Sequence, residues 1–183
     1  MGDSGMKSLA KSIIATIDGI TVKTGDFVSY LSLAMMLLTT LVVLLRYGFN
    51  IGWISLQELV MYFHTTMFML GAAYTLKHDA HVRVDVFYRN WSPKGKARAD
   101  LLGSLFLLAP LAIFTLITSW NYVGQAWAIR ESSPESGGLA GVFLLKTLIP
   151  IMAIWILFQG ISQALKAVFI LMDKTDKGES SHG

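Results

Sequence analysis

The chain has 183 residues, of which 54% are hydrophobic and only 15% are charged. Because a soluble domain carries about 25% charged residues, this composition excludes a fully water-facing surface and indicates a membrane protein. The chain has no cysteine, which excludes disulfides, thiol chemistry and cysteine-ligated metal sites. It also lacks a Lys- and Arg-rich arm, so nucleic acid is not an expected partner.

Residues 1–26 lack the apolar core of a cleavable signal peptide, so we expect no processing. At helical spacing, one side of this segment is apolar and the other is charged. The apolar side holds Met6, Leu9, Ile13, Ile17 and Ile20, and the opposite side holds Lys7, Lys11 and Asp18. This pattern predicts a cytoplasmic amphipathic helix that lies in the membrane interface, with a frayed tail as the alternative.

Four long apolar blocks follow, and each is long enough to cross a bilayer, which takes ~20 residues. We expect spans at 27–47, 54–76, 101–129 and 139–172, connected by a cytoplasmic loop at 77–100 and a periplasmic loop at 130–138, with a cytoplasmic tail at 173–183. The last two blocks are longer than a span requires. Pro110 and Pro150 are expected kink sites in them because proline removes a backbone donor. The predicted fold is a single all-α membrane domain of four transmembrane helices.

The basic residues predict the orientation of these spans. One side of the membrane would hold only Arg46, Arg130 and Lys146. The other side would hold Lys7, Lys11, Lys23, Lys77, Arg83, Arg89, Lys94, Lys96, Arg98, Lys166, Lys174 and Lys177. Because positive charge marks the cytoplasmic side, both termini and the central loop are expected in the cytoplasm of a cell whose inner membrane holds the chain.

Two predicted spans carry polar stripes. The third has Ser104, Thr115, Thr118, Asn121 and Gln125 within one arc, and the fourth has Gln159, Ser162, Gln163 and Lys166. Polar side chains within a membrane normally face other helices or a wet cavity. Packing within this chain and contact with a partner chain are both open on this evidence.

Glu58 is the one carboxylate well inside an apolar block, about one turn from the expected outer surface. An intramembrane acid is a functional candidate, and it could carry protons in a stand-alone exporter. Its position near the interface favours a structural or interface role, with Tyr62 one turn away as a hydrogen-bond partner.

Histidines offer two weaker alternatives. His64 lies near mid-span and could be a haem ligand in a redox-enzyme anchor, although a second histidine at the same depth on another helix is lacking. His78, Asp79, His81 and Asp85 are close in sequence, but their spacing does not match a known metal-ligand set, and an ordinary polar loop is expected there.

The central loop has a helical pattern of its own. Its apolar side gathers Val84, Phe87, Tyr88 and Trp91, and Arg83, Asp85 and Arg89 lie elsewhere around the helix. This pattern predicts a second interfacial helix. Ser92 and Pro93 then have the residue types of an N-cap and a first helical position, so the third long helix is expected to begin at Pro93.

Two runs of residues resemble the small membrane subunit of tripartite ATP-independent periplasmic (TRAP) transporters. The first run is His81-Val82-Arg83-Val84-Asp85, which follows the second span. The second run is Glu135-Ser136-Gly137-Gly138-Leu139, with Phe143, Lys146, Thr147, Pro150 and Gln159-Gly160 beyond it. The likeness covers about residues 25–172. Ala140 stands where many relatives have proline.

The resemblance implies a non-catalytic transporter subunit that takes no cofactor. A periplasmic binding protein would deliver an organic acid or similar solute to a separate large membrane subunit, which would hold the sodium sites and the moving domain. This chain would scaffold that subunit among membrane lipids, with an interfacial phospholipid as a further expected contact. The chain's end soon after the fourth span favours a separate large subunit.

The predicted interface or structural positions have three sources. Arg83, Asp85, Gly137, Gly138 and Lys146 follow the family pattern, Glu58 is chosen on physical grounds, and Gln159 and Gln163 belong to the polar stripe. None is expected to bind substrate or metal. Gly137 and Gly138 are expected to permit a turn that other residues cannot make, and Lys146 is expected to reach back towards the outer surface.

Overall fold

The computed structural model describes residues 2–78 and 91–172. These residues form the helices α1 (Gly2–Gly48), α2 (Ile54–Lys77), α4 (Pro93–Gly103), α5 (Ala109–Ala128) and α6 (Val142–Met172), with a π-helical segment, η1 (Ser104–Leu108), between α4 and α5. Four stretches are long and apolar enough to cross a membrane: Lys7–Gly48, Ile54–Lys77, Pro93–Ala128 and Val142–Met172. The expected all-α fold with four long apolar helices is therefore confirmed.

The first helix differs from the expected division into an interfacial helix and a span. Residues 2–48 form one continuous α-helix of 47 residues, which is about 70 Å long at 1.5 Å per residue. No proline interrupts the segment, and Gly19 and Gly25 lie within the helix. The expected boundary at residue 26 rested on a change in composition, and such a change does not break the backbone hydrogen-bond ladder.

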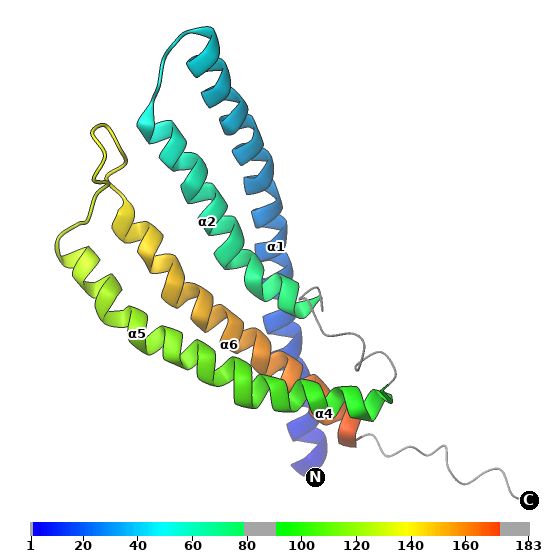
Figure 1. Ribbon diagram of the computed structural model, residues 1–183. Coiled ribbons are helices and arrows are strands. Elements are labelled where there is room, and N and C mark those ends of the chain that lie inside the picture. The colour runs from blue at the N-terminus through cyan, green and yellow to red at the C-terminus, as the bar shows by residue number, and fades with distance from the viewer. Residues whose placement is uncertain (1, 79–90, 173–183) are drawn as a thin grey trace, which may run out of the picture.

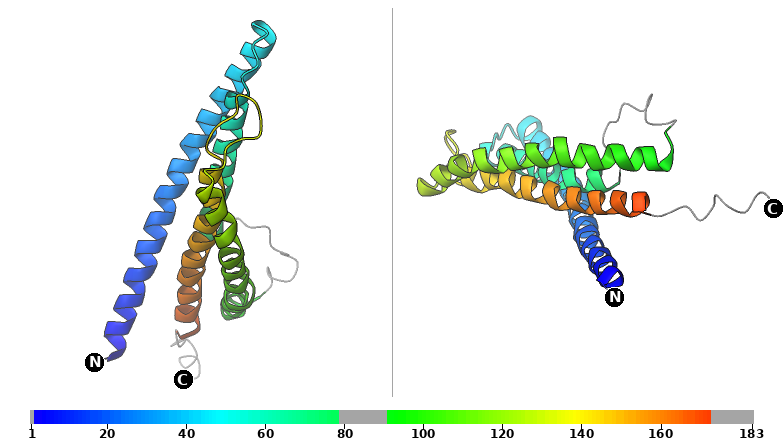
Figure 2. Two further views of the ribbon diagram at one scale, coloured as in Figure 1. Left: turned by 90° about the vertical axis from the view of Figure 1, so that its left-hand side faces the viewer. Right: turned by 90° about the horizontal axis from the view of Figure 1, so that it is seen from below.

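The helices pack as two antiparallel hairpins (Figure 1). Helix α1 packs on α2, α2 packs on α6, and α6 packs on α4 and α5. The α1–α2 and α5–α6 connections lie at one end of the molecule, here called the hairpin end. The first residues of α1, the last of α6 and the first of α4 lie at the opposite end, here called the terminal end. Figure 2 shows that α1 crosses the other helices at an angle.

The third long helix begins where the sequence predicts. The Ser92 side chain accepts a hydrogen bond from the Gly95 backbone N–H at 3.2 Å, and Pro93 is the first helical residue. The helix then contains the π turn of η1, in which the Ala109 N–H donates to the Ser104 carbonyl. Pro110, which has no N–H to donate, follows directly. The whole of α4, η1 and α5 curves along α6 (Figure 1).

The fourth helix begins at Val142, three residues later than the predicted span, because 139–141 belong to the connection before it. It continues as one α-helix through Pro150, which is buried against its neighbours. Pro150 therefore does not divide α6 into two helices, and a kink within the continuous helix stays a prediction.

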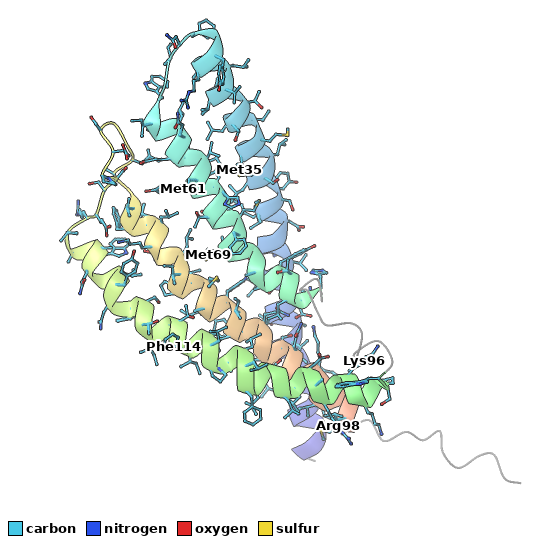
Figure 3. All side chains as sticks on the ribbon, viewed as in Figure 1. Met35, Met61, Met69, Lys96, Arg98 and Phe114 are labelled. Atoms are coloured by element: carbon cyan, nitrogen blue, oxygen red, sulfur yellow. The ribbon has the colours of Figure 1, made fainter. Side chains whose placement is uncertain are left out.

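Small side chains form the contacts between the helices. The buried apolar residues include Ala73, Ala97, Ala112, Ala126, Ala153 and Ala167. Large apolar side chains point outwards instead; Phe114 on α5, labelled in Figure 3, is 64% exposed. This arrangement is typical of membrane helices, whose backbones approach closely at small residues while large side chains meet lipid.

Candidate functional site

A polar cluster joins three helices near the terminal end. Asp18 on α1 lies at its centre and accepts hydrogen bonds from three side chains of α6. These are Lys166 Nζ at 2.5 Å, Ser162 Oγ at 2.8 Å and Gln159 Nε2 at 3.2 Å. The Lys77 ammonium at the end of α2 donates to the Asp18 backbone carbonyl at 3.0 Å.

The innermost members of this cluster have no access to solvent or lipid. Thr21 is 1% exposed, and Gln159 and Ser162 are both 0% exposed. The Thr21 hydroxyl donates to Gln159 Oε1 at 2.8 Å, so both ends of the Gln159 amide have a partner within the chain. Because an unsatisfied polar group in hydrocarbon costs several kcal/mol, these bonds fix α1 against α6.

Helical spacing explains why one stripe of α6 reaches two helices. Gln159, Ser162, Gln163 and Lys166 follow the i, i+3, i+4, i+7 pattern of one helix face. Three of them meet Asp18, while Gln163 donates its amide to the Leu76 backbone carbonyl of α2. Of the two alternatives for this stripe, the structure places it in packing within the chain. Gln159 is fully covered by its own helices.

A second polar cluster at the hairpin end is centred on Glu58. One carboxylate oxygen, Oε1, accepts a hydrogen bond from the Ser133 hydroxyl, and the other, Oε2, accepts one from the Leu139 backbone N–H at 2.6 Å. The same loop is closed by a hydrogen bond from the Ser133 N–H to the Leu139 carbonyl at 3.0 Å. Glu58 therefore holds both sides of the α5–α6 loop, at Ser133 and at Leu139, against α2.

The two glycines of this loop meet different requirements. Gly137 has a φ of +84°, a left-handed conformation that glycine adopts without steric cost. Gly138 lies against the Glu58 cluster: an added Cβ would be 2.5 Å from Ser133 Oγ and 2.8 Å from Glu58 Oε1. The run Gly137-Gly138 thus combines a backbone turn with a close approach, in line with the turn predicted for this pair.

Lys146 ties the start of α6 to the end of α5. Its ammonium lies 2.7 Å and 2.5 Å from the two carboxylate oxygens of Glu131, and 4.1 Å from the centre of the Tyr122 ring. Beside it, the Trp127 indole N–H donates to the Thr147 hydroxyl at 2.8 Å. Lys146 thus extends towards the loop, and its charge is compensated within the same hairpin.

Tyr62 does not bond to Glu58, contrary to the sequence-based expectation. Its hydroxyl oxygen is buried and has no hydrogen-bond partner among the described residues. The phenol lies instead against Gly141, where an added Cβ would be 3.7 Å from the hydroxyl, and the Glu58 carboxylate accepts from Ser133 and Leu139.

Other predicted positions have different outcomes. Residues 79–90 lie outside the described part of the chain. They include Arg83 and Asp85, nearly all of the interfacial helix predicted in the central loop, and Asp79 and His81 of the weak metal candidate. In the third span, Ser104 is buried, whereas Thr115 is half-buried and Thr118 is exposed, and both threonines bond to carbonyls of their own helix. Most of the third-span stripe thus lies outside the packing of this chain, and its contact with a partner chain stays a prediction.

The described histidines do not form a haem-type pair. His64 is exposed on α2, and His78 caps the end of the same helix with its Nδ1 2.9 Å from the Tyr74 carbonyl. Among residues 2–78 and 91–172, no group of three or more His, Asp and Glu side chains could hold a metal ion. The geometry gives no support to the redox-anchor alternative.

Sequence reasoning missed Asp18, Glu131 and Ser133 as members of these clusters. Asp18 was assigned to the charged side of an interfacial helix. An acid and a base on two helices of a membrane protein often pair with each other, and Lys166 was available as such a partner. Ser133 and Glu131 lie in a short polar loop, where sequence alone does not indicate which groups turn back onto the helices. In the first cluster Asp18 forms an ion pair with Lys166, and in the second the Glu58 carboxylate accepts hydrogen bonds from Ser133 and Leu139. Both clusters therefore use their polar groups to join segments of this chain.

The comparisons with known proteins identify the family. The family described as tripartite ATP-independent periplasmic transporters, DctQ component, matches residues 35–169. The chain is also 30% identical over 106 residues to the C4-dicarboxylate TRAP transporter small permease protein DctQ of Vibrio cholerae serotype O1, over 55% of this chain and 45% of the relative. The match thus spans about half the length of that relative. No solved structure matches the chain. Because the family match covers more than half of its length, this chain belongs to the DctQ family of small permease components of TRAP transporters, a non-enzymatic transporter family.

Proposed function

We propose that this chain is the scaffold of a sodium-coupled TRAP importer in the bacterial inner membrane. A separate large membrane subunit would move the solute by an elevator motion and bind the sodium, and a periplasmic binding protein would deliver the solute. The observation that carries the proposal is the way the chain uses its polar groups. Asp18, Glu58, Gln159 and Lys166 connect the chain's own helices, which suits a rigid support for a moving partner.

The solute is proposed to be a small organic acid. The Vibrio cholerae relative has C4-dicarboxylate in its name, and the same class is the first to test here. Selectivity would belong to the binding protein and the large subunit. Glu58, whose two carboxylate oxygens both accept hydrogen bonds from the loop, is poorly placed to carry protons, so the stand-alone exporter is the weaker alternative.

We further propose that the terminal end faces the cytoplasm. Lys96 and Arg98, labelled in Figure 3, lie towards that end. Lys7 near the start of α1, Lys77 at the end of α2 and Lys166 near the end of α6 lie towards it as well. Arg46, Arg130 and Lys146 lie towards the hairpin end. The excess of positive charge at the terminal end supports a cytoplasmic location. Because the chain has no cysteine, Ser136→Cys should react with an impermeant maleimide from the periplasm, while Ser8→Cys should react only after the cells are lysed.

The function is tested by uptake. The large subunit and this chain would be co-expressed, purified together and reconstituted in liposomes with the binding protein and a C4-dicarboxylate. We expect one-to-one copurification and uptake that needs a sodium gradient, the binding protein and both membrane chains. Uptake by the large subunit without this chain, or by this chain alone, would disprove the scaffold role.

A further inference from the structure

We propose that the outward face of α2 is the contact surface for a transmembrane helix of the large subunit, and that this helix hydrogen-bonds to His64 in the middle of the membrane. The inference rests on the proposed function, because that function provides a large membrane subunit as the partner. It adds the helix of this chain that meets the partner and the kind of side chain that the partner brings there.

The exposed part of α2 is a single narrow stripe. Helices α1 and α6 both pack on α2. Among residues 55–77, the exposed ones are Gln57, Met61, His64 and Phe68, and the others are buried or half-buried. Their spacing of four, three and four residues places them on one side of the helix, as in the seam between two packed helices. The open surface of α2 is therefore about one helix wide.

His64 lies in the middle of this stripe and in the middle of the span. It is about 15 Å along the helix axis from the start of α2 at Ile54 and about 20 Å from its end at Lys77. The hydrocarbon core of a bilayer is about 30 Å thick, so headgroups and bulk water lie far from the imidazole. Each of its two ring nitrogens can take part in a hydrogen bond, but neither does so within the described part of the chain.

Lipid does not supply the missing partner, because acyl chains have neither a donor nor an acceptor. Thr40 on α1 and Thr118 on α5 are exposed as well. Their hydroxyls donate to carbonyls of their own helices at 2.9 Å and 2.8 Å, so lipid alone can surround them. His64 makes no such bond. A histidine in a membrane span normally faces other helices or a wet cavity, and a polar side chain on a neighbouring helix is the group that can pair with it.

The exposed amide of Asn121 on α5 does not carry the same implication. Trp120 and Tyr122 flank it and are at least 50% exposed, and exposed Trp and Tyr are typical of the membrane–water interface. Water and headgroups can therefore reach Asn121. On the α2 side the exposed tryptophan is Trp53, which directly precedes the helix and lies about three turns from His64. His64 is thus well below the level that such residues mark.

Photocrosslinking in the intact two-chain complex tests the location. The photoreactive residue p-benzoylphenylalanine would replace Phe68, which is 68% exposed and one turn from His64, or, as the control, Phe114 on α5, which is 64% exposed. We expect an adduct with the large subunit from position 68 and not from position 114. The proposal is overturned if position 68 reacts only with phospholipid or with a second copy of this chain. It is also overturned if position 114 reacts with the large subunit at least as well.

Substitution of His64 tests the hydrogen bond. His64→Leu removes both ring nitrogens, whereas His64→Gln keeps a donor and an acceptor in its amide. Thr118→Val is the matched control, because it removes an exposed polar group on α5 that is already paired within its own helix. We expect His64→Leu to weaken association with the large subunit about three-fold, the size of an average hydrogen bond between membrane helices. His64→Gln should recover most of the affinity, and Thr118→Val should leave it unchanged.

The dissociation constant would be measured with fluorescently labelled chains in detergent micelles. The role of His64 is overturned if His64→Leu binds as tightly as the wild type, or if His64→Gln binds as weakly as His64→Leu. Failure of the wild-type chains to associate at all would instead refute the proposed function, which separates that outcome from a misplaced interface.

Discussion

Glu58 and Leu139 lie 81 positions apart in the sequence and are joined by a hydrogen bond of 2.6 Å from the Leu139 N–H to Glu58 Oε2. The bond connects the two hairpins of the layer at their common end. Together with the Ser133 hydroxyl on the other carboxylate oxygen, it lets a single side chain of α2 hold two points of the α5–α6 connection. An acid within an apolar block is thus used to hold a loop.

The first prediction separates this role from proton transport. Glu58→Gln keeps an amide oxygen that can accept from Leu139 and an amide group that can donate to Ser133, so the loop should stay in place. Glu58→Ala removes both acceptors and leaves a part-buried N–H unpaired. We expect the midpoint of thermal unfolding in detergent, followed by tryptophan fluorescence, to fall clearly for Glu58→Ala and much less for Glu58→Gln.

Uptake by the reconstituted complex provides the decisive comparison for Glu58. If the residue holds the loop, Glu58→Gln retains most of the sodium-driven uptake. If the residue carries protons, Glu58→Gln abolishes transport while its unfolding midpoint remains close to that of the wild type. The second pattern would refute the structural role.

The second prediction concerns Gly138. In Gly138→Ala the new methyl group would be 2.5 Å from Ser133 Oγ and 2.8 Å from Glu58 Oε1, so the loop or the carboxylate must move. We expect a loss of about 1–3 kcal/mol in unfolding free energy, typical of an added methyl in a filled site. Adding Ser133→Gly to this variant removes the atoms in the way and should restore part of the loss. A loss that Ser133→Gly does not reduce would show that a different contact is responsible.

The third prediction concerns Asp18. Asp18→Ala removes the acceptor shared by Gln159, Ser162 and Lys166, two of which are 0% exposed. Hydrogen bonds to a charged group contribute about 1.5–3 kcal/mol each, and partial exposure of Asp18 and Lys166 lowers the sum. We expect a net loss of about 2–3 kcal/mol, with Asp18→Asn intermediate because its amide oxygen still accepts.

Asp26 provides the matched control for Asp18. It is an exposed acid on the same helix, so Asp26→Ala removes a similar charge without removing a contact between helices. We expect Asp26→Ala to unfold within about 0.5 kcal/mol of the wild type, as surface substitutions usually do. Equal losses for the two variants would mean that Asp18 acts through the net charge of α1 and not through α6.

Local signals in the sequence predicted the elements well and the contacts between them poorly. The Ser92-Pro93 start of α4 and the turn at Gly137 depend on neighbouring residues alone, and both were predicted. The pairing of Asp18 with Lys166, 148 positions away, depends on how α1 crosses α6. Membrane helices are apolar on most sides, so hydrophobic periodicity does not specify which faces meet. The continuity of α1 was missed because charged residues in its first half were taken to mark a boundary.

The last prediction tests the crossing of α1 and α2, which brings two helix backbones together at a glycine. A Cβ at Gly25 would overlap the ring of Tyr74, whereas a Cβ at Gly19 on the same helix would meet nothing within 4 Å. Alanine favours a helix over glycine by up to about 1 kcal/mol, so Gly19→Ala should leave the unfolding midpoint unchanged or raise it. Gly25→Ala should lower it, because the Tyr74 ring must leave its place against α1. Adding Tyr74→Ala to Gly25→Ala should then recover part of the loss, since the overlapping atoms are gone. If Gly25→Ala behaves like Gly19→Ala, the close contact between α1 and α2 does not exist at this position in the folded protein.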